Sequence, residues 1–459
     1  MVRTRFAPSP TGYLHLGNAR IALLNQIVAL QGGGKFFLRI EDTDRERSSS
    51  IFVDAIMEDL AWLGVSWEGA PVFQSSRLHL YREKCLELWS KGWVYPCFCT
   101  PQELEAHRQE CLRKGRPPRY SGRCRSISPS EAQARIAEGE PFSLRLKVDP
   151  KARVEWADII KGRKRFRGKD LDDIVLLRSD GLPTYHLSVV VDDGEMGITH
   201  VIRGEDHIAN TPYHILLFEA LGYTVPSFAH VPLVKAPSGE VLEKRQASPW
   251  SLRVLRKEGY LPLAVVNFLV TLGWNPPHPP PLTWKEILES FELKDVSPTP
   301  VSFHPPSLDS INKKIMATIP VEELMDQVKP FLSFPVSLSK ERWATLLEMV
   351  RANAATLSEL AMWVEKVVKG PEEVTLSDRE RELLNGFLSF LQGSGFATVT
   401  SFAQALPAFA QGLDRDSKRL FYRSLRKVLT GEVSGPPLKD IMDFLGDQEI
   451  KKRILGFII

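Results

Sequence analysis

The sequence predicts an α/β fold with a largely parallel sheet in its first half, followed by all-α domains. Three observations support this prediction. Runs rich in β-branched and aromatic residues alternate with helical patterns in the first half, as they do in βαβ units. Residues 72–185 are richer in Arg, Cys and Pro before this alternation resumes, which indicates an inserted domain. Beyond Pro320 the patterns are helical.

The first βα unit can be bounded from its residue pattern. Residues 2–7 predict a strand that prolines end, and residues 18–31 predict a helix with apolar side chains at helical spacing. Three glycines at 32–34 close this helix. Residues 35–40 predict a second strand that runs directly into an acidic cluster, and residues 197–203 predict a strand beyond the insertion.

The second half contains one long apolar run and four helical patterns. The apolar run, residues 261–274, is interrupted by Asn267 and Gly273. It is shorter than the roughly 20 residues that cross a bilayer, so we expect a buried helix. The predicted helices cover residues 321–331, 340–352, 416–429 and 439–445.

The composition is that of an ordinary globular protein. The 459 residues suffice for about three domains or more, and 43% hydrophobic with 25% charged residues is a normal balance. The opening MVRTRFAPSP lacks the apolar stretch of a signal peptide, so we expect a cytoplasmic protein with no membrane segment. Five cysteines, an odd number, argue against a disulfide framework.

Local basic patches indicate a polyanionic partner more strongly than the net charge does. The net charge is only +3, from 59 basic and 56 acidic residues. Residues 108–125 hold seven basic side chains and residues 161–169 hold six. Both patches suit phosphate backbones, although either one alone fits a solvated hairpin or loop equally well.

The segment from Phe6 to Asn18 joins a strand, a proline-stiffened turn and a helix start. Backbone N–H groups and the helix dipole make such a start an anion site. Gly17 permits close approach of a nucleotide, and His15 can donate a hydrogen bond to a phosphate oxygen. A histidine in this position is also a common structural cap, so the motif alone leaves both roles open.

Four short blocks follow one another in the first 212 residues. They are RFAPSPTG at 5–12 with HLGN at 15–18, RIEDTD at 39–44, LPTY at 182–185 with VVDD at 190–193, and VIRGEDH at 201–207 with NTP at 210–212. This series resembles the motifs of class I aminoacyl-tRNA synthetases, of which the first is the HIGH motif, in the form used by the glutamyl and glutaminyl branch. The segments at 429–431 and 445–446 resemble the anticodon-binding part of bacterial-type glutamyl-tRNA synthetases. The glutaminyl branch, whose anticodon domain is typically a β-barrel, is thereby excluded.

The resemblance implies a five-part organisation. A Rossmann-type class I catalytic domain would comprise residues 1–75 with 186–235. An acceptor-stem-binding domain would be inserted at 76–185, and a stem-contact domain would cover 236–320. Two helical anticodon-binding domains would follow at 321–372 and 373–459.

The resemblance also implies a reaction. The family ligates L-glutamate to the 3′ end of tRNA(Glu) through a glutamyl-adenylate, using ATP with Mg²⁺, and we expect a monomer. Whether tRNA(Gln) is a second or the main substrate stays open. A catalytically weakened tRNA-binding paralogue is another alternative. The short paralogue that glutamylates a modified tRNA base lacks the C-terminal helical domains, and a zinc-ribbon regulator with an unrelated α/β domain does not account for the four blocks.

A glutamate site needs cations to bind the two carboxylates of the amino acid and a carboxylate to bind its ammonium. Arg5 and Arg203 end strands that should converge on one crevice, where open α/β sheets bind ligands. By resemblance, Arg5 binds the side-chain carboxylate and Glu41 the ammonium. The same resemblance assigns the rest of the amino acid to Ala7, Ser9, Tyr185 and Arg203. Each arginine could instead form a surface salt bridge.

The ATP site implied by the resemblance departs from the family pattern in one loop. The family has Lys-Leu-Ser-Lys-Arg where this chain has VLEKR at 241–245, so Val241 and Glu243 are the departures. Catalytic roles fall on His15 and Lys244. The implied ATP ligands are His15, Gly17, Asn18, Glu205, Lys244 and Arg245.

The resemblance further implies tRNA contacts and a metal site. Asp44 would meet the terminal ribose, and Asn353 would meet the first anticodon base unless the alignment shifts by two residues to Arg351. One zinc ion per chain would be bound by Cys97, Cys99, Tyr120 and Cys124. Three cysteines alone would also fit buried structural thiols, and Ser126 stands where some relatives have a histidine.

Overall fold

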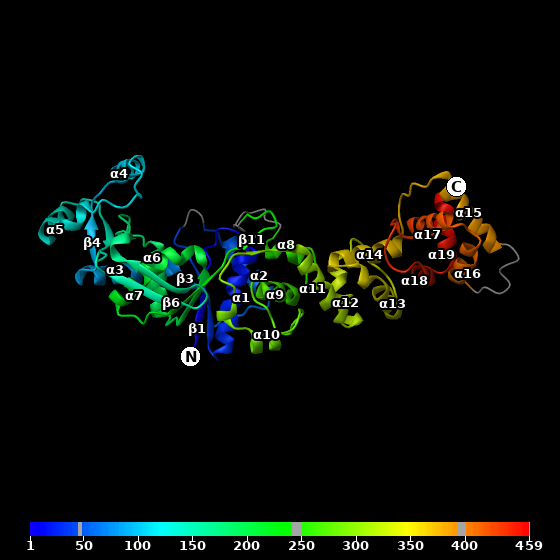
Figure 1. The fold of residues 1–459 in the computed structure, drawn as a ribbon, viewed down its shortest axis with the longest axis horizontal. Coiled ribbons are helices and arrows are strands. Elements are labelled where there is room, and N and C mark those ends of the chain that lie inside the picture. Colours follow the sequence, from blue (N-terminus) through cyan, green and yellow to red (C-terminus); the bar gives the residue numbers. More distant parts are fainter. Residues whose placement is uncertain (45–47, 241–249, 393–400, 459) are drawn as a thin grey trace. The chain divides into compact units, whose positions relative to one another are not determined.

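The computed structural model describes residues 1–44, 48–240, 250–392 and 401–458 (Figure 1). These residues form two compact units: one contains residues 1–253 and 266–304, and the other contains residues 254–265 and 305–459. In the described part of the chain, no helix is long and apolar enough to span a bilayer. The five-part domain organisation stays a prediction.

The first unit is built on parallel strands. β1 (Arg3–Phe6), β2 (Lys35–Ile40) and β3 (Val72–Phe73) pair in the order β1-β2-β3, and β9 (His200–Gly204) pairs with β10 (Ser227–Val231). Thr199 joins the two sets, because its N–H donates to the carbonyl of Arg3 at 2.9 Å and its own carbonyl accepts from Ser227 at 2.9 Å. The predicted α/β class with a parallel sheet is confirmed.

The helix α1 (Leu16–Gln31) connects β1 to β2 and packs on both strands. It begins two residues before the prediction because His15 caps it, and it ends at the three glycines as predicted. A side chain at Gly34 would place its Cβ 1.8 Å from the carbonyl oxygen of Val2. Only glycine therefore lets the chain turn back close enough to start β2 beside β1.

Further helices of the first unit pack near the sheet. They are α2 (Ser50–Trp62), α3 (Leu78–Ser90), α6 (Tyr185–Glu195) and α7 (Thr211–Leu221). The helices α3, α6 and α7 enclose a core with the strands that follow them, in which Tyr81, Leu187, Leu217 and Phe228 are almost completely buried.

The inserted region has antiparallel strands, unlike the sheet that it interrupts. β4 (Val94–Cys97), β5 (Ser143–Leu146) and β8 (Val175–Leu177) form one sheet, and β6 (Arg153–Asp158) with β7 (Gly162–Arg167) form a hairpin. The hairpin packs against β10 through Trp156 and Phe228, whose ring centroids lie 6.4 Å apart. The insertion also contains α4 (Pro101–Arg113) and α5 (Pro129–Ala137), and Figure 1 shows α4 standing apart from the strands. None of the residues of α4 is buried.

The remaining elements before α11 are short, and the division into units falls within α8 and α9. They are β11 (Val234–Lys235), α8 (Leu252–Lys257), α9 (Pro262–Thr271), α10 (Trp284–Ser290) and β12 (Val301–Ser302). The apolar run 261–274 is indeed a buried helix over most of its length, and the glycine at 273, with a φ of 72°, stands just beyond it.

The second unit, as far as it is described, is entirely helical. It contains α11 (Pro305–Thr318), α12 (Val321–Val328), α13 (Lys340–Val350), α14 (Leu357–Lys369), α15 (Asp378–Gln392), α16 (Phe402–Gln411), α17 (Arg415–Thr430), α18 (Leu438–Leu445) and α19 (Asp447–Ile458). All four predicted helices are confirmed. The first two are shorter than predicted because 3₁₀ turns at Lys329–Phe331 and Arg351–Asn353 follow α12 and α13.

Candidate active site

A cavity of about 500 Å³ lies at the carboxyl ends of β1, β2, β9 and β10. This is the edge of an open α/β sheet at which ligands bind. Nine of the predicted site residues line it: Arg5, Ala7, Ser9, His15, Gly17, Asn18, Glu41, Tyr185 and Arg203. The sequence motifs, which are spread over some 200 residues, are therefore brought together at one place.

The other predicted site residues lie elsewhere. Glu205 is beside the cavity rather than in its lining: it forms an ion pair with Lys161 and accepts a hydrogen bond from the N–H of Leu233 at 2.9 Å. It thus holds Leu233, which does line the cavity. Asp44 is outside the lining, Asn353 belongs to the second unit, and Lys244 and Arg245 fall outside the described residues together with the rest of 241–249.

His15 is a helix cap whose tautomer can be deduced. Its Nδ1 accepts from the backbone N–H of Gly17 at 3.1 Å and, less closely, of Asn18 at 3.4 Å. A nitrogen that accepts carries no proton, so the neutral ring carries its proton on Nε2. The capping role and the donor role left open by the sequence are therefore compatible in one side chain. A Cβ at Gly17 would lie 3.0 Å from the imidazole, so this position favours glycine.

A buried ion-pair network lies behind the cavity lining and reaches it through Arg5 and Glu41. Asp193 accepts two hydrogen bonds from Arg5, at 3.0 and 3.2 Å, and one from Arg39 at 2.5 Å. Asp192 accepts from the Nε of Arg77 at 2.8 Å and from the hydroxyl of Tyr81 at 2.8 Å. Burial opposes ionisation of Asp193, but Arg39 and Arg5 outweigh it and hold the pKa of the carboxyl below its usual range.

Glu41 lines the cavity at the end of β2. Its side chain lies 3.3 Å from the guanidinium of Arg39. Burial raises the pKa of Glu41 above its ordinary value, because desolvation outweighs the effect of the nearby arginines. A cationic group entering the cavity beside Glu41 would favour its charged form, so this carboxylate suits a substrate ammonium.

Arg203 also lines the cavity and is buried among uncharged partners. Its Nη2 donates to Thr211 Oγ1 at 2.8 Å and its Nε to His230 Nε2 at 3.3 Å. Its Nη1 lies 3.1 Å from His214 Nδ1 and 3.4 Å from the hydroxyl of Tyr185. Among the residues that the structure describes, no ion pair of Arg203 with a carboxylate is found. His214 and His230 could not be identified from the sequence, because no local motif marks their contacts with Arg203.

Comparison with known proteins identifies the family. The family described as tRNA synthetases class I (E and Q), catalytic domain, matches residues 1–310, and an anticodon binding domain matches residues 323–458. Glutamate–tRNA ligase of Aquifex aeolicus is 41% identical over 99% of this chain and 98% of its own length. The chain belongs to the glutamate–tRNA ligases. The corresponding ligase of Carboxydothermus hydrogenoformans is 37% identical over 99% of both chains.

Solved structures of glutamate–tRNA ligases agree with this assignment. The crystal structure of a glutamate tRNA ligase from Elizabethkingia meningosepticum in complex with its amino acid has a TM-score of 0.86 and 30% identity, covering 100% of this chain and 99% of that one. The match to an anticodon binding domain disfavours the short paralogue, which lacks that part. The catalytic-domain match over residues 1–310 likewise disfavours a zinc-ribbon regulator.

A cysteine cluster in the inserted region has the geometry of a metal site. The Sγ atoms of Cys97, Cys99 and Cys124 all lie within 4.8 Å of one another, and those of Cys99 and Cys124 are 3.6 Å apart. The hydroxyl of Tyr120 lies 3.3 Å from Cys97 and 3.6 Å from Cys99. Ligands about 2.3 Å from a tetrahedral zinc ion are separated by about 3.8 Å, so the four donors fit such an ion.

The electrostatics of this cluster favour the thiolate of Cys97 over that of Cys99. Burial opposes ionisation of Cys97, but Tyr120 and Arg145 outweigh it and lower the pKa of its thiol. Burial raises the pKa of Cys99 to about 11. The guanidinium of Arg145 lies 3.9 Å from the centroid of the Tyr120 ring, so it supplies positive charge next to the donors.

Proposed function

We propose that this chain joins L-glutamate to the 3′ end of a tRNA at the expense of ATP, as its relatives' names describe. The observation that carries the proposal is the cavity itself. It combines a helix start that suits phosphate, a buried carboxylate that suits an ammonium, and buried guanidinium groups that suit carboxylates. These are the groups that glutamate and ATP present together.

In the first step, an oxygen of the glutamate α-carboxylate attacks the α-phosphorus of ATP. A new O–P bond forms, the bond to the β-phosphate oxygen breaks, and pyrophosphate leaves. We propose that the Nε2–H of His15 donates a hydrogen bond to the phosphate oxygens, where negative charge develops. The N–H groups of Gly17 and Asn18 donate to His15, so we assign these residues to the phosphate side as the positive end of the α1 dipole. Lys244 with Arg245 supply further positive charge. Synthetases of this family use ATP with Mg²⁺, which shields phosphate charge.

We assign the amino acid to the side of the cavity that carries Arg5, Glu41 and Arg203. Arg5 binds the side-chain carboxylate, Glu41 accepts from the ammonium, and Arg203 with Tyr185 holds the remainder, while Ala7 and Ser9 line the space between them. In the second step, a hydroxyl of the terminal ribose attacks the activated carbonyl and AMP leaves. Asp44 is assigned to that ribose, and Glu205 supports the wall through Leu233.

A resident zinc ion belongs to the proposal as a structural group. Cys97 and Cys99 end and follow β4, whereas Cys124 lies in a 3₁₀ helix (Arg123–Ser126). An ion held by these three thiolates and Tyr120 would tie two segments of the insertion together. We also infer that the chain is a monomer, and we propose tRNA(Gln) as a second acceptor of glutamate. A cytoplasmic location stays a prediction.

Aminoacylation with purified tRNA(Glu) and tRNA(Gln) in turn tests the function. We expect glutamylation of tRNA(Glu) at a rate that depends on ATP, and we expect pyrophosphate exchange only when tRNA is present. Strong exchange without tRNA would remove the second expectation. A chain that binds tRNA but gives no exchange with it would be the catalytically weakened paralogue instead.

The variant Arg203→Lys and the control variant Lys285→Arg sharpen this test. Lysine keeps one charge but loses the planar set of donors, so the KM for glutamate should rise about tenfold or more. Lys285 is exposed on α10, and its replacement should change nothing. A KM unaffected by the change at 203 would remove Arg203 from the glutamate site.

A further inference from the structure

The charged groups around the cavity include a balanced group and two buried guanidinium groups outside it, Arg20 and Arg203. The balanced group contains three guanidinium groups and three carboxylates that contact one another: Arg5, Arg39, Arg77, Glu41, Asp192 and Asp193. Arg20 donates to the backbone carbonyls of Pro232, at 3.4 Å, and of Leu272. Arg203 has no carboxylate partner in the described part of the chain, and Asp158 lies behind its partner His230. The guanidinium of Arg203 is therefore held without direct contact to a carboxylate.

The partners of Arg203 act as acceptors without carrying charge. A guanidinium nitrogen can only donate, so the imidazole nitrogens that face it must present a lone pair. This fixes His214 with Nδ1 unprotonated and His230 with Nε2 unprotonated. Neither ring can be an imidazolium in this arrangement, because an imidazolium has no lone pair to offer.

The second nitrogen of each ring has its own partner, which holds the tautomer. His214 Nε2 lies 3.3 Å from His186 Nδ1, and His230 Nδ1 lies 2.5 Å from Asp158 Oδ2. Each neutral ring therefore donates away from Arg203 and accepts toward it. Burial and the charge of Arg203 hold the pKa of His214 well below its usual range, and burial lowers the pKa of His230 as well.

We propose that His214 and His230 are positioning residues that hold Arg203 through uncharged acceptors, so that its full charge stays available to a carboxylate of glutamate. The inference rests on the proposed function, since it names glutamate as the carboxylate ligand. A carboxylate in place of either ring would hold the guanidinium more tightly. That carboxylate would also neutralise the guanidinium of Arg203, and its negative charge would repel the carboxylate of the substrate.

Two variants at His214 separate two effects: the positioning of Arg203 by a hydrogen-bond acceptor, and the absence of charge on that acceptor. The Oδ1 atom of asparagine or aspartate replaces Nδ1 at the same distance from Cβ, so His214→Asn and His214→Asp differ mainly in charge. His200→Asn and His200→Asp are the matched controls, because His200 begins β9 on the same strand as Arg203 but does not line the cavity. The full-length chain is used, and calorimetric binding of L-glutamate is measured beside KM values for glutamate and ATP.

We expect His214→Asp to weaken glutamate binding by about tenfold or more relative to His214→Asn, since charges roughly 6 Å apart interact appreciably in a buried site. The KM for ATP should differ by less than about twofold between the two variants, and the His200 pair should differ in neither quantity. A structural role alone predicts the opposite order, because aspartate is the better partner for a guanidinium.

Three results would overturn the inference: equal glutamate binding by the two His214 variants, tighter binding by the aspartate variant, or no glutamate binding by the wild-type chain. If the aspartate variant does not fold, Thr211→Asn and Thr211→Asp repeat the comparison at the first residue of α7, where an acid suits the helix dipole. The wild-type chain could bind glutamate but charge no tRNA, while His214→Asp binds glutamate more weakly than His214→Asn. In that case the proposed function fails and the inference stands.

Discussion

Arg5 and Asp193 form a two-point ion pair although 188 positions separate them in the sequence. The side chains of both are almost completely buried, at 5% and 1% exposed. Asp193 also neutralises Arg39, so one carboxylate supports two guanidinium groups, of which that of Arg5 lines the cavity. This relationship joins the end of the first strand to the end of α6.

Asp193→Asn should strongly destabilise the protein. The change removes the charge but keeps the shape, which leaves Arg5 and Arg39 buried with less compensation. Breaking a buried pair in this way costs about 3–5 kcal/mol. Denaturant unfolding measures the effect, and Glu68→Gln is the control, because its pair with Lys35 is half exposed and should contribute little. Equal losses from the two variants would contradict the account.

A second prediction concerns pH and the second unit. Burial alone would raise the pKa of Glu380, but hydrogen bonds from Lys427, at 2.8 Å, and from Ser377, at 2.9 Å, outweigh it and lower that pKa to about 2. Because the folded pKa lies below the ordinary value of 4.5, the stabilisation is complete above about pH 4.5. It is lost as the pH falls toward 2, and it amounts to on the order of 2–3 kcal/mol.

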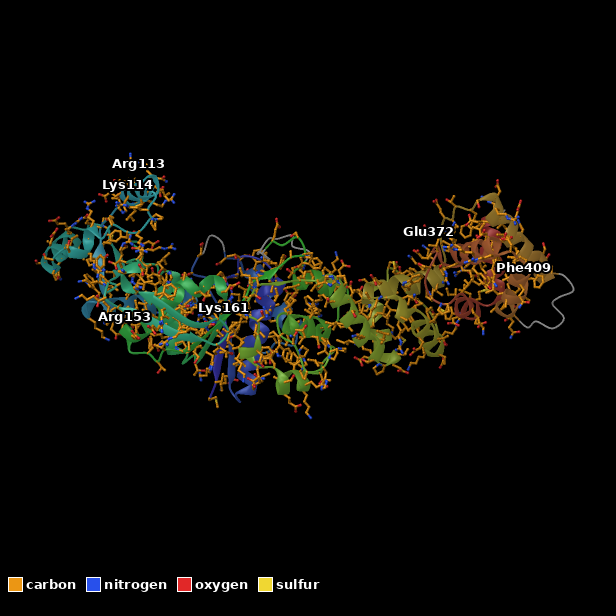
Figure 2. The ribbon with its side chains drawn as sticks, viewed as in Figure 1. Arg113, Lys114, Arg153, Lys161, Glu372 and Phe409 are labelled. Atoms are coloured by element: carbon orange, nitrogen blue, oxygen red, sulfur yellow. The ribbon has the colours of Figure 1, made fainter. Side chains whose placement is uncertain are left out.

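Thermal unfolding of wild type and Glu380→Gln at pH 7 and pH 3 tests this. The difference between the two proteins should be largest at pH 7 and should shrink at pH 3. Glu372→Gln is the control, because Glu372 is 77% exposed beside Lys369 (Figure 2). A difference that does not change with pH would assign the effect of Glu380 to packing instead of charge.

Metal analysis tests the zinc site. Protein washed with a chelator and dialysed should retain close to one zinc ion per chain, and Cys97→Ser, Cys99→Ser or Cys124→Ser should each reduce that content. Cys111→Ser should not, because Cys111 lies on α4 outside the cluster, with its sulfur 3.5 Å from His107. A wild-type protein that is free of metal and retains the fold of the insertion would refute the prediction.

The choice of tRNA provides the fourth prediction. Asn353 ends the 3₁₀ turn after α13, and its carbonyl accepts from the indole N–H of Trp363 at 3.2 Å. A neutral side chain here should reject the alternative first anticodon base less strongly than an arginine would, since rejection depends on clash and unpaired groups. We therefore expect detectable charging of tRNA(Gln).

Asn353→Arg should lower the kcat/KM for tRNA(Gln) about tenfold and that for tRNA(Glu) much less. Asn385→Arg, at an exposed position on α15, controls for the added charge. Charging of tRNA(Gln) by the wild type at the background rate would defeat the proposal, and equal losses with both tRNAs would assign Asn353 to general affinity.

Local patterns predict the fold class and the bounds of several elements, because such patterns depend on residues close together in the sequence. The strand at 35–40 and the helices beginning at 321 and 340 follow from apolar spacing and from prolines or glycines at their ends. The bounds of α14 were not predicted within the helical region beyond Pro320, although its apolar side chains have helical spacing. Its start is marked by Thr356, which accepts a hydrogen bond from the N–H of Glu359 and is a recognisable N-cap.

The sequence motifs of the candidate site could be predicted, but the contacts between its side chains could not. Arg5 and Arg203 follow from strand ends, yet their partners are chosen by three-dimensional packing. Asp193 reaches Arg5 from α6, and His214 reaches Arg203 from α7. No spacing rule links these pairs, so the sequence left the salt-bridge alternative open for both arginines. The structure shows an ion pair for Arg5 and none with a carboxylate for Arg203 among its described contacts.

The helix α4 depends on its own residues for its conformation. Thr100 and Glu103 form a capping box at its start, and pairs such as Glu110 with Lys114 lie one turn apart on its surface. Since none of its residues is buried, replacing most of its side chains should cost the hydrophobic core nothing. Natural variation along this helix is then free to follow whatever binds its outer surface, where Arg113 and Lys114 project (Figure 2). Sequence drift in α4 would record changes in partners more faithfully than drift in the sheet, where folding itself restricts substitution.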